Sequence, residues 1–162
     1  MIIVVSGSSC TGKSVIARAL ARKLRFKYID VNELIREKKL RGRYLDDLDS
    51  YEVDFKKLNR FLISLIKKNK NLVIDSHLSH YLPNKYVDCC VICKCDLKTL
   101  KKRLKLRGYS ERKIRENLDS EIFDVCFVEA TENKHKVIVA DTTKKSVNSC
   151  VRDVLNNIHF HK

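Results

Sequence analysis

The segment Gly7-Ser-Ser-Cys-Thr-Gly12-Lys13-Ser14 restricts the fold of this chain more than any other feature. It has the spacing of a phosphate-binding loop, and it directly follows the apolar run Ile2–Val5. Such a loop binds phosphate where it joins a β-strand to the N-terminus of a helix, because its backbone N–H groups must converge on the anion. The sequence therefore predicts a strand ending near Ser6, a helix beginning near Lys13 and a nucleoside triphosphate site between them.

Several side chains near this loop are candidates for phosphate chemistry. We expect Lys13 to reach the β- and γ-phosphates and the Ser14 hydroxyl to bind Mg²⁺. Asp75 closes a second apolar run, and ligands of parallel sheets gather at the carboxyl ends of the strands. We therefore predict that Asp75 holds the same Mg²⁺, directly or through water. His77 either orients water or a phosphate or is an ordinary loop residue, and spacing alone leaves both interpretations open.

Short apolar runs alternate with longer amphipathic stretches along the whole chain. The runs lack polar alternation, which is typical of strands covered on both faces. The expected strands are Met1–Ser6, Lys27–Asp30, Leu72–Asp75, Val87–Lys94 and Val137–Asp141, and the expected helices are Lys13–Leu24, Glu52–Lys68, Leu97–Arg107, Glu111–Ala130 and Lys145–Ile158. This alternation predicts one α/β domain over residues 1–162, with a five-stranded parallel sheet flanked by helices.

One polar stretch interrupts this alternation. It covers Arg36–Ser50 and ends in Asp46-Asp-Leu-Asp49. Such a stretch between core elements is either a mobile functional loop or plain surface, and its length does not decide between them.

Positive charge is concentrated in one segment, Lys94–Arg115. The formal net charge is +14, and Lys94–Arg115 holds ten Lys and Arg residues against Asp96 and Glu111. Arg103 and Arg107 are four residues apart, so they share one helical face, and a glycine follows them. Two arginines so placed suit a closing lid that neutralises charge on a transferred phosphoryl group. The neighbouring lysines form either a solvated face or a contact with an anionic partner.

The cysteines indicate a reducing compartment. There are seven of them, and an odd number without an export signal argues against a disulfide framework. Cys89, Cys90, Cys93 and Cys95 fall in the run Val87–Cys95, which is typical of a buried strand and favours core packing over zinc binding or redox chemistry. Alternation predicts that Cys90 faces away from the other three.

Targeting segments are not evident in the sequence. The N-terminal apolar run is far shorter than the ~20 residues that span a bilayer. No basic segment followed by an apolar stretch marks a signal peptide. We therefore expect a cytoplasmic location, or a nuclear one in a cell with a nucleus.

These motifs together resemble the adenylate kinase isoenzyme 6 family, in an archaeal-type member. The family consists of small P-loop kinases that are also linked to maturation of the small ribosomal subunit. The similarity covers nearly the whole chain. It is carried by the phosphate loop and by Lys27–Arg36, Asp75-Ser-His77, Arg103-Leu-Lys-Leu-Arg-Gly-Tyr-Ser110, Arg115–Asp124 and Glu129-Ala130.

The resemblance implies an adenylate-kinase-like fold and a set of site residues. It implies a nucleoside-monophosphate-binding (NMP-binding) segment over about residues 30–51 and a short lid over about residues 106–116. Asp75 and His77 would form a modified Walker B element, and Arg36 would clamp the phosphate of AMP. The residues implied to contact ATP are Cys10, Gly12, Lys13, Ser14, Val15 and Arg107.

The phosphate loop also departs from the usual adenylate kinase pattern. Ser9 and Cys10 stand where adenylate kinases commonly have Pro and Gly. If position 10 requires a positive φ, Cys10 is strained there.

We expect a Mg²⁺-dependent nucleoside monophosphate kinase that converts ATP and AMP to two ADP. Lys13, Arg103 and Arg107 would neutralise the transferring phosphoryl group, while Arg36 orients the acceptor. The alternative is an assembly ATPase that uses nucleotide as a switch on pre-ribosomal particles. The charge favours rRNA as its partner, and the resemblance implies a small-subunit ribosomal protein. A third interpretation, a kinase for a small metabolite, is disfavoured by Arg36.

Overall fold

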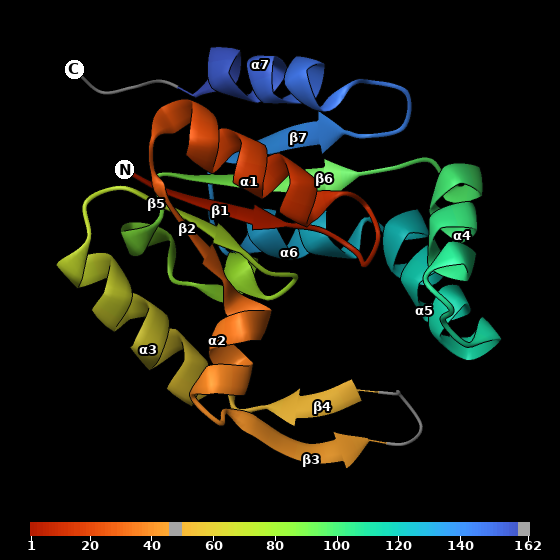
Figure 1. The fold of residues 1–162 in the computed structure, drawn as a ribbon, viewed down its shortest axis with the longest axis horizontal. Helices are drawn as coiled ribbons and strands as arrows, with labels where there is room; N and C mark the ends of the chain where they lie inside the picture. Colours follow the sequence, from red (N-terminus) through yellow and green to blue (C-terminus); the bar gives the residue numbers. More distant parts are fainter. Residues whose placement is uncertain (46–49, 159–162) are drawn as a thin grey trace.

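The computed structural model describes residues 1–45 and 50–158. At its centre is a parallel sheet of five strands in the order β2-β5-β1-β6-β7 (Figure 1). The strands are β1 (Ile2–Ser6), β2 (Lys27–Asp30), β5 (Leu72–Asp75), β6 (Cys89–Lys94) and β7 (Val137–Asp141). This confirms the predicted five-stranded sheet. Because β1 is the middle strand, the phosphate loop that follows it lies at the centre of the sheet's carboxyl edge.

Helices cover both faces of the sheet. Leu20 of α1 and Val154 of α7 pack on one face, while Leu62 of α3 and Ala130 of α6 pack on the other (Figure 1). The helices are α1 (Lys13–Leu24), α2 (Val31–Glu37), α3 (Phe55–Lys68), α4 (Leu97–Leu106), α5 (Glu111–Ile122), α6 (Val125–Glu132) and α7 (Val147–Asn157), with short 3₁₀ turns η2 (Ser79–Tyr81) and η3 (Asn84–Tyr86). Within the described part of the chain, none of them is long and apolar enough to span a membrane.

The polar stretch after β2 is more ordered than a plain loop. The Asp30 carboxylate accepts the N–H of Asn32 and so caps α2. An antiparallel pair follows, β3 (Arg41–Leu45) with β4 (Ser50–Val53), and extends away from the main sheet (Figure 1). The helix expected over Glu52–Lys68 begins at Phe55 instead of Glu52, because β4 takes up the preceding residues. The acidic run Asp46–Asp49 lies outside the described residues.

The long helix expected over Glu111–Ala130 is two helices. Asp124 adopts a left-handed conformation with φ of 53°, which ends α5 and turns the chain into α6. Its carboxylate pairs with the Lys94 ammonium at the end of β6. The prediction of one helix was wrong because both segments have compatible apolar periodicity, and the break coincides with an ion pair between residues that are 30 positions apart. The other expected core elements end within two residues of their predicted bounds.

The clustered cysteines are core residues. Cys89 and Cys93 are buried on the face covered by α1 and α7, and Cys90 is buried on the other face, as predicted. Cys95 does not share their face, because β6 ends at Lys94 and strand alternation stops there; it packs with α4 and α5. Burial raises the pKa of the Cys93 thiol to about 12. A thiol with so high a pKa is a poor nucleophile and a poor metal ligand.

Candidate active site

The phosphate loop depends on three residues in left-handed or glycine-only conformations. Gly7 has φ of +138°, and a Cβ there would lie 2.4 Å from the Cys93 carbonyl oxygen, so only glycine fits. Gly12 has φ of +95°. Cys10 has φ of 63°, which confirms that this position needs a positive φ. The loop conformation therefore includes local backbone strain at Cys10.

The carbonyl of Ser8 organises the interior of the loop. It accepts hydrogen bonds from Lys13 Nζ at 2.8 Å and from Thr11 Oγ1 at 2.8 Å. These contacts fold the loop around one oxygen and bring the lysine ammonium across the loop.

The N-terminus of α1 is open toward a ligand. Its N-cap is Gly12, which has no side chain to accept the first helical N–H groups, and the first turn contains no acidic residue. Uncapped N–H groups and the positive end of the helix dipole attract an anion. Lys13 reinforces this, because loss of water around its ammonium lowers its pKa, while the nearby Asp75 carboxylate opposes the shift. A bound phosphate would add negative charge beside the Lys13 ammonium and stabilise it further.

A cavity of about 540 Å³ adjoins this loop, and most of the predicted site residues line it. They are Cys10, Gly12, Lys13, Ser14, Val15, Asp75, His77, Arg103 and Arg107. Arg36 does not line the cavity; it is exposed on α2. The cavity is also lined by residues that were not predicted as site residues, namely Ser9, Ile16, Asn32, Tyr109, Thr142, Lys145, Val147 and Cys150. Asn32 and Thr142 follow the ends of β2 and β7, so the rule that ligands gather at carboxyl edges could have found them.

Asp75 is positioned to hold a cation. It ends β5, is only 3% exposed and accepts a hydrogen bond from the Tyr28 hydroxyl at 2.8 Å. Ser14 lines the same cavity from the first turn of α1. A carboxylate and a hydroxyl are oxygen ligands of the kind that Mg²⁺ prefers. The donor set therefore fits Mg²⁺.

His77 faces the cavity and remains neutral near pH 7. Partial loss of water lowers its pKa to about 4, and the nearby Lys13 cation contributes to the same shift. A neutral imidazole can donate or accept a hydrogen bond next to a phosphate without adding charge.

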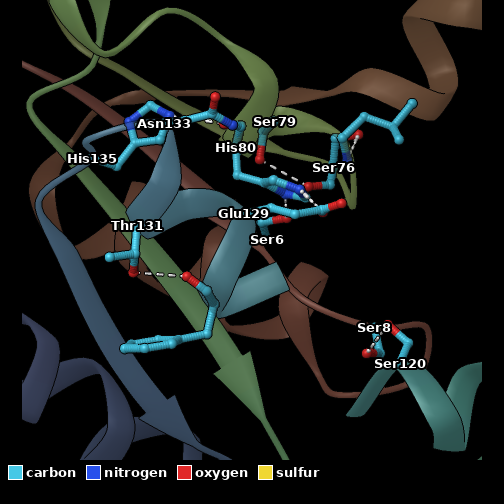
Figure 2. A network of polar contacts seen from close by, with 12 residues as sticks. Ser6, Ser8, Ser76, Ser79, His80, Ser120, Glu129, Thr131, Asn133 and His135 are labelled. Atoms are coloured by element: carbon cyan, nitrogen blue, oxygen red, sulfur yellow. Dashed lines mark hydrogen bonds and ion pairs between the residues drawn. The ribbon is translucent and has the colours of Figure 1, made fainter. Parts of the chain in front are cut away.

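The loop that carries His77 is held by a buried network around His80 (Figure 2). His80 Nδ1 lies 2.7 Å from Ser6 Oγ, and Nε2 lies 2.8 Å from Glu129 Oε2. The His80 carbonyl accepts hydrogen bonds from His135 and Asn133. The order Ser–His–Glu is that of a hydrolase triad, but Ser6 is completely buried and no substrate can reach it. The network instead ties the end of β1 to the turn after β5.

The two predicted lid arginines have different surroundings. Arg103 donates to Thr142 Oγ1 at 3.0 Å and to the Thr142 carbonyl at 2.8 Å. Thr142 in turn donates to the Thr11 carbonyl at 2.6 Å, so Arg103 is fixed to the phosphate loop through this threonine. Arg107 follows α4, is exposed and precedes Gly108, which has φ of +75°. Arg107 is thus placed at the turn between α4 and α5.

Known proteins are similar to this chain in sequence. A family model described as an AAA domain matches residues 3–124. A "putative adenylate kinase" of Methanocaldococcus jannaschii is 35% identical over 100% of this chain and 88% of that protein. A protein of the same name from Pyrococcus furiosus is 38% identical over 98% of this chain and 84% of that protein.

Solved structures show the same fold at low sequence identity. Shikimate kinase from Acinetobacter baumannii, in complex with shikimate, has a TM-score of 0.68 at 15% identity and covers 96% of this chain and 90% of its own. The YorR protein of Bacillus subtilis, in complex with phosphorylated GDP, has a TM-score of 0.65 at 19% identity, and the match covers 99% of this chain and 100% of YorR. The chain therefore has the fold of P-loop kinases.

Proposed function

The chain belongs to the family whose archaeal members are named putative adenylate kinases, and on this premise we propose that it is a nucleoside monophosphate kinase. The reaction is transfer of the γ-phosphoryl group of ATP to AMP, which gives two ADP. The bond between the γ-phosphorus and the β–γ bridging oxygen breaks, and a bond to a phosphate oxygen of AMP forms. Phosphoryl transfer of this kind depends mainly on positioning and on neutralising charge.

The uncapped N-terminus of α1 beside Lys13 is the single observation that carries the proposal. It provides N–H groups and an ammonium at one end of the cavity, as the β- and γ-phosphates of ATP require. Ser14 and Asp75 would hold Mg²⁺, which supplies charge neutralisation at the phosphates when it is bound. Val15 and the backbone at Cys10 and Gly12 would complete the ATP contacts.

Arginines supply positive charge to the other side of the cavity. Arg107 is exposed at the α4–α5 turn and is free of the anchoring contact that holds Arg103 to Thr142. We assign to Arg107 the direct contact with the transferring phosphoryl group. Arg103 would contribute positive charge from its fixed place in the cavity wall. His77 would contact a phosphate or its water as a neutral group.

The acceptor site lies on the segment between β2 and α3 in this proposal. Arg36 on α2 is the candidate for the AMP phosphate, and β3 and β4 extend beyond the body of the protein on the same side (Figure 1). Because Arg36 stands outside the cavity wall, its engagement requires movement of α2 toward the phosphate loop. Lids and acceptor segments commonly move in this way on substrate binding.

A coupled assay of ADP formation tests the proposed reaction. With ATP and Mg²⁺ present, addition of AMP is expected to accelerate ADP formation, and a comparison of AMP, CMP, GMP, UMP and dAMP identifies the preferred acceptor. Arg36→Ala is expected to abolish the AMP-dependent rate and to leave hydrolysis of ATP alone unchanged. Arg22→Ala, on an exposed part of α1, is the matched control. A rate that does not respond to any acceptor contradicts the kinase proposal.

A second candidate function is ATP-dependent action on an RNA-containing particle, favoured by a row of lysines on α4. Lys98, Lys101, Lys102 and Lys105 are exposed and recur at the spacing of one helical face, opposite the buried Leu100 and Leu104. Like charges at this spacing repel one another, and an RNA backbone would relieve that repulsion. The ribosomal protein partner remains a prediction from the family resemblance.

Binding to RNA at several salt concentrations tests this second candidate. Replacing the four α4 lysines by Gln is expected to reduce the slope of log K against log salt by about four, or about one for each phosphate contact. The same change at Lys56, Lys57, Lys67 and Lys68 of α3, all exposed, alters the net charge equally and is the control. Equal loss of binding in both variants would show that only net charge matters. Absence of binding at physiological salt would exclude this candidate.

A further inference from the structure

We propose that Asn117 and Glu121 of α5 are positioning residues that hold the phosphate loop in its nucleotide-binding conformation. The inference rests on the nucleotide-binding function proposed above and gives a role to Arg115–Asp124, a run that contributes no residue to the cavity wall. Asn117 and Glu121 are four residues apart, so they lie on the same face of α5. That face contacts the loop between Gly7 and Lys13.

Asn117 fixes the direction of one loop peptide. The Ser9 N–H donates to Asn117 Oδ1 at 3.0 Å, and Asn117 Nδ2 donates to the Lys113 carbonyl at 2.7 Å. The second bond holds the amide so that its oxygen faces the loop. The Ser9 peptide is therefore directed to α5, whereas the peptides at the start of α1 remain open to the cavity.

Glu121 joins the loop to the end of a neighbouring strand. Its Oε2 accepts the Ser8 hydroxyl at 2.9 Å, and its Oε1 accepts the Cys95 N–H at 3.0 Å. The Ser8 carbonyl is bonded on its other side by Lys13 and Thr11. Ser8 is thus held through its side chain by α5 and through its backbone by the loop itself. Release of the side chain would leave the carbonyl, and with it the lysine ammonium, free to move.

The charge of Glu121 argues that its role is geometric. A carboxylate near bound phosphates repels them, so it contributes nothing favourable to the electrostatics of nucleotide binding. Its two oxygens instead satisfy a hydroxyl and a backbone N–H. A glutamine can make both contacts, because its amide oxygen can accept from Cys95 while its amide nitrogen donates to Ser8 Oγ. Glu121→Gln therefore removes the charge and keeps the contacts, whereas Glu121→Ala removes both.

Calorimetric titration with Mg·ATP separates these contributions. Glu121→Ala and Asn117→Ala are each expected to weaken ATP binding about tenfold, the loss that follows from one well-placed hydrogen bond. Glu121→Gln is expected to bind ATP at least as tightly as the wild type. Asp119→Ala, an exposed carboxylate of the same helix, is the matched control and should be unchanged.

A loop-side variant and a stability measurement complete the test. Ser8→Ala removes the contacts of the Ser8 hydroxyl with Glu121 and Ser120 without altering α5. Combined with Glu121→Ala, it should weaken binding no further than Glu121→Ala alone. Unchanged ATP affinity in Ser8→Ala, Glu121→Ala and Asn117→Ala, with only a loss of unfolding free energy, would overturn the inference in favour of a purely structural role. Wild-type protein that binds no ATP would contradict the proposed function itself, and the inference would fail with it.

Discussion

The hydroxyl of Tyr28 on β2 donates a 2.8 Å hydrogen bond to Oδ2 of Asp75 on β5. The two strands are adjacent and parallel, with Asp75 paired in register with Asp30 two residues beyond the tyrosine. Burial and the Asp75 carboxylate both raise the pKa of Tyr28, so the phenol remains a protonated donor at neutral pH. Arg18 lies over the same ring, 5.4 Å from its centroid. The candidate Mg²⁺ ligand is thus oriented by a neighbour outside the cavity wall.

Tyr28→Phe should therefore impair metal-dependent turnover more than folding. Loss of the hydroxyl leaves Asp75 less well oriented, and we expect the Mg²⁺ concentration for half-maximal activity to rise about tenfold. The free energy of unfolding should fall by about 1 kcal/mol, the net value of one hydrogen bond. Mg²⁺ titration of the coupled assay and urea unfolding measure the two effects. Tyr86→Phe, in η3, is the control, and an unchanged Mg²⁺ dependence would contradict the role of Tyr28.

Arg107 and Arg103 should respond differently to removal of their side chains. Arg107→Ala is expected to lower kcat about a hundredfold or more with no change in stability, because this exposed side chain acts on developing charge. Arg103→Ala should also lower the free energy of unfolding, by about 1–3 kcal/mol, because it removes two hydrogen bonds to Thr142. Thermal unfolding and steady-state kinetics on both variants make the comparison. A stability loss in Arg107→Ala of the same size would refute this division.

His77 should make the protein less stable in acid. Its pKa is lowered from 6.5 to about 4 in the folded state, so the unfolded chain binds the proton first as the pH falls. Stability linked to this group is therefore fully present above pH 6.5 and is lost as the pH falls from there toward 4. Because solvent exposure of the ring screens its charge, we expect the free energy of unfolding to fall by only about 1 kcal/mol between about pH 7.5 and about pH 5. His77→Gln should reduce this pH dependence in urea unfolding, and an identical dependence would contradict the prediction.

The left-handed conformation at position 10 predicts an order among substitutions. Cys10→Gly relieves the strain but loses side-chain packing near Leu100 and Tyr109, so stability and ATP affinity should remain close to those of the wild type. Cys10→Val places a β-branched residue at φ of 63°, which should lower the free energy of unfolding by about 2 kcal/mol and distort the loop. Thermal unfolding and ATP titration rank the three proteins. A valine variant equal to the wild type would show that the loop does not need this backbone conformation.

The network around His80 should tolerate loss of charge better than loss of hydrogen bonds. Burial lowers the pKa of His80, although Glu129 opposes this shift, so the imidazole is expected to be neutral at pH 7. A neutral ring can donate from Nε2 to Glu129 and accept from Ser6. Glu129→Gln keeps an acceptor and should lower the free energy of unfolding by less than about 1 kcal/mol. Glu129→Leu removes the acceptor and should lower it by about 2 kcal/mol. Urea unfolding distinguishes them, and equal losses would argue that the ion pair dominates.

The sheet and most of the cavity were predictable because they depend on local patterns. Continuous apolar runs identify buried parallel strands, and the spacing of glycines and lysine identifies the segment after β1 as a phosphate loop. The position of Asp75 is then expected from the rule that ligands gather at carboxyl edges. Each of these inferences needs only a few consecutive residues and one general rule of parallel sheets.

The features that escaped prediction depend on partners distant in sequence. The break at Asp124 coincides with an ion pair to Lys94, and β3 exists only because β4 pairs with it. The spacing of Arg103 to Arg107 places both at the site, but it does not reveal that the Arg103 guanidinium bonds Thr142, which lies 39 residues further along the chain. No local pattern contains that information.

The bond from Thr142 to the Thr11 carbonyl joins residues 131 positions apart and has a consequence for biosynthesis. A nascent chain that has left the ribosome as far as α6 already contains Lys13, Asp75 and Arg107, but it lacks β7 and the threonine that closes the cavity wall. Any nucleotide that binds this cavity therefore stabilises finished molecules in preference to unfinished ones. Ligand binding would therefore add stability only after synthesis is complete, because the residue that follows β7 forms part of the site whose phosphate loop follows β1.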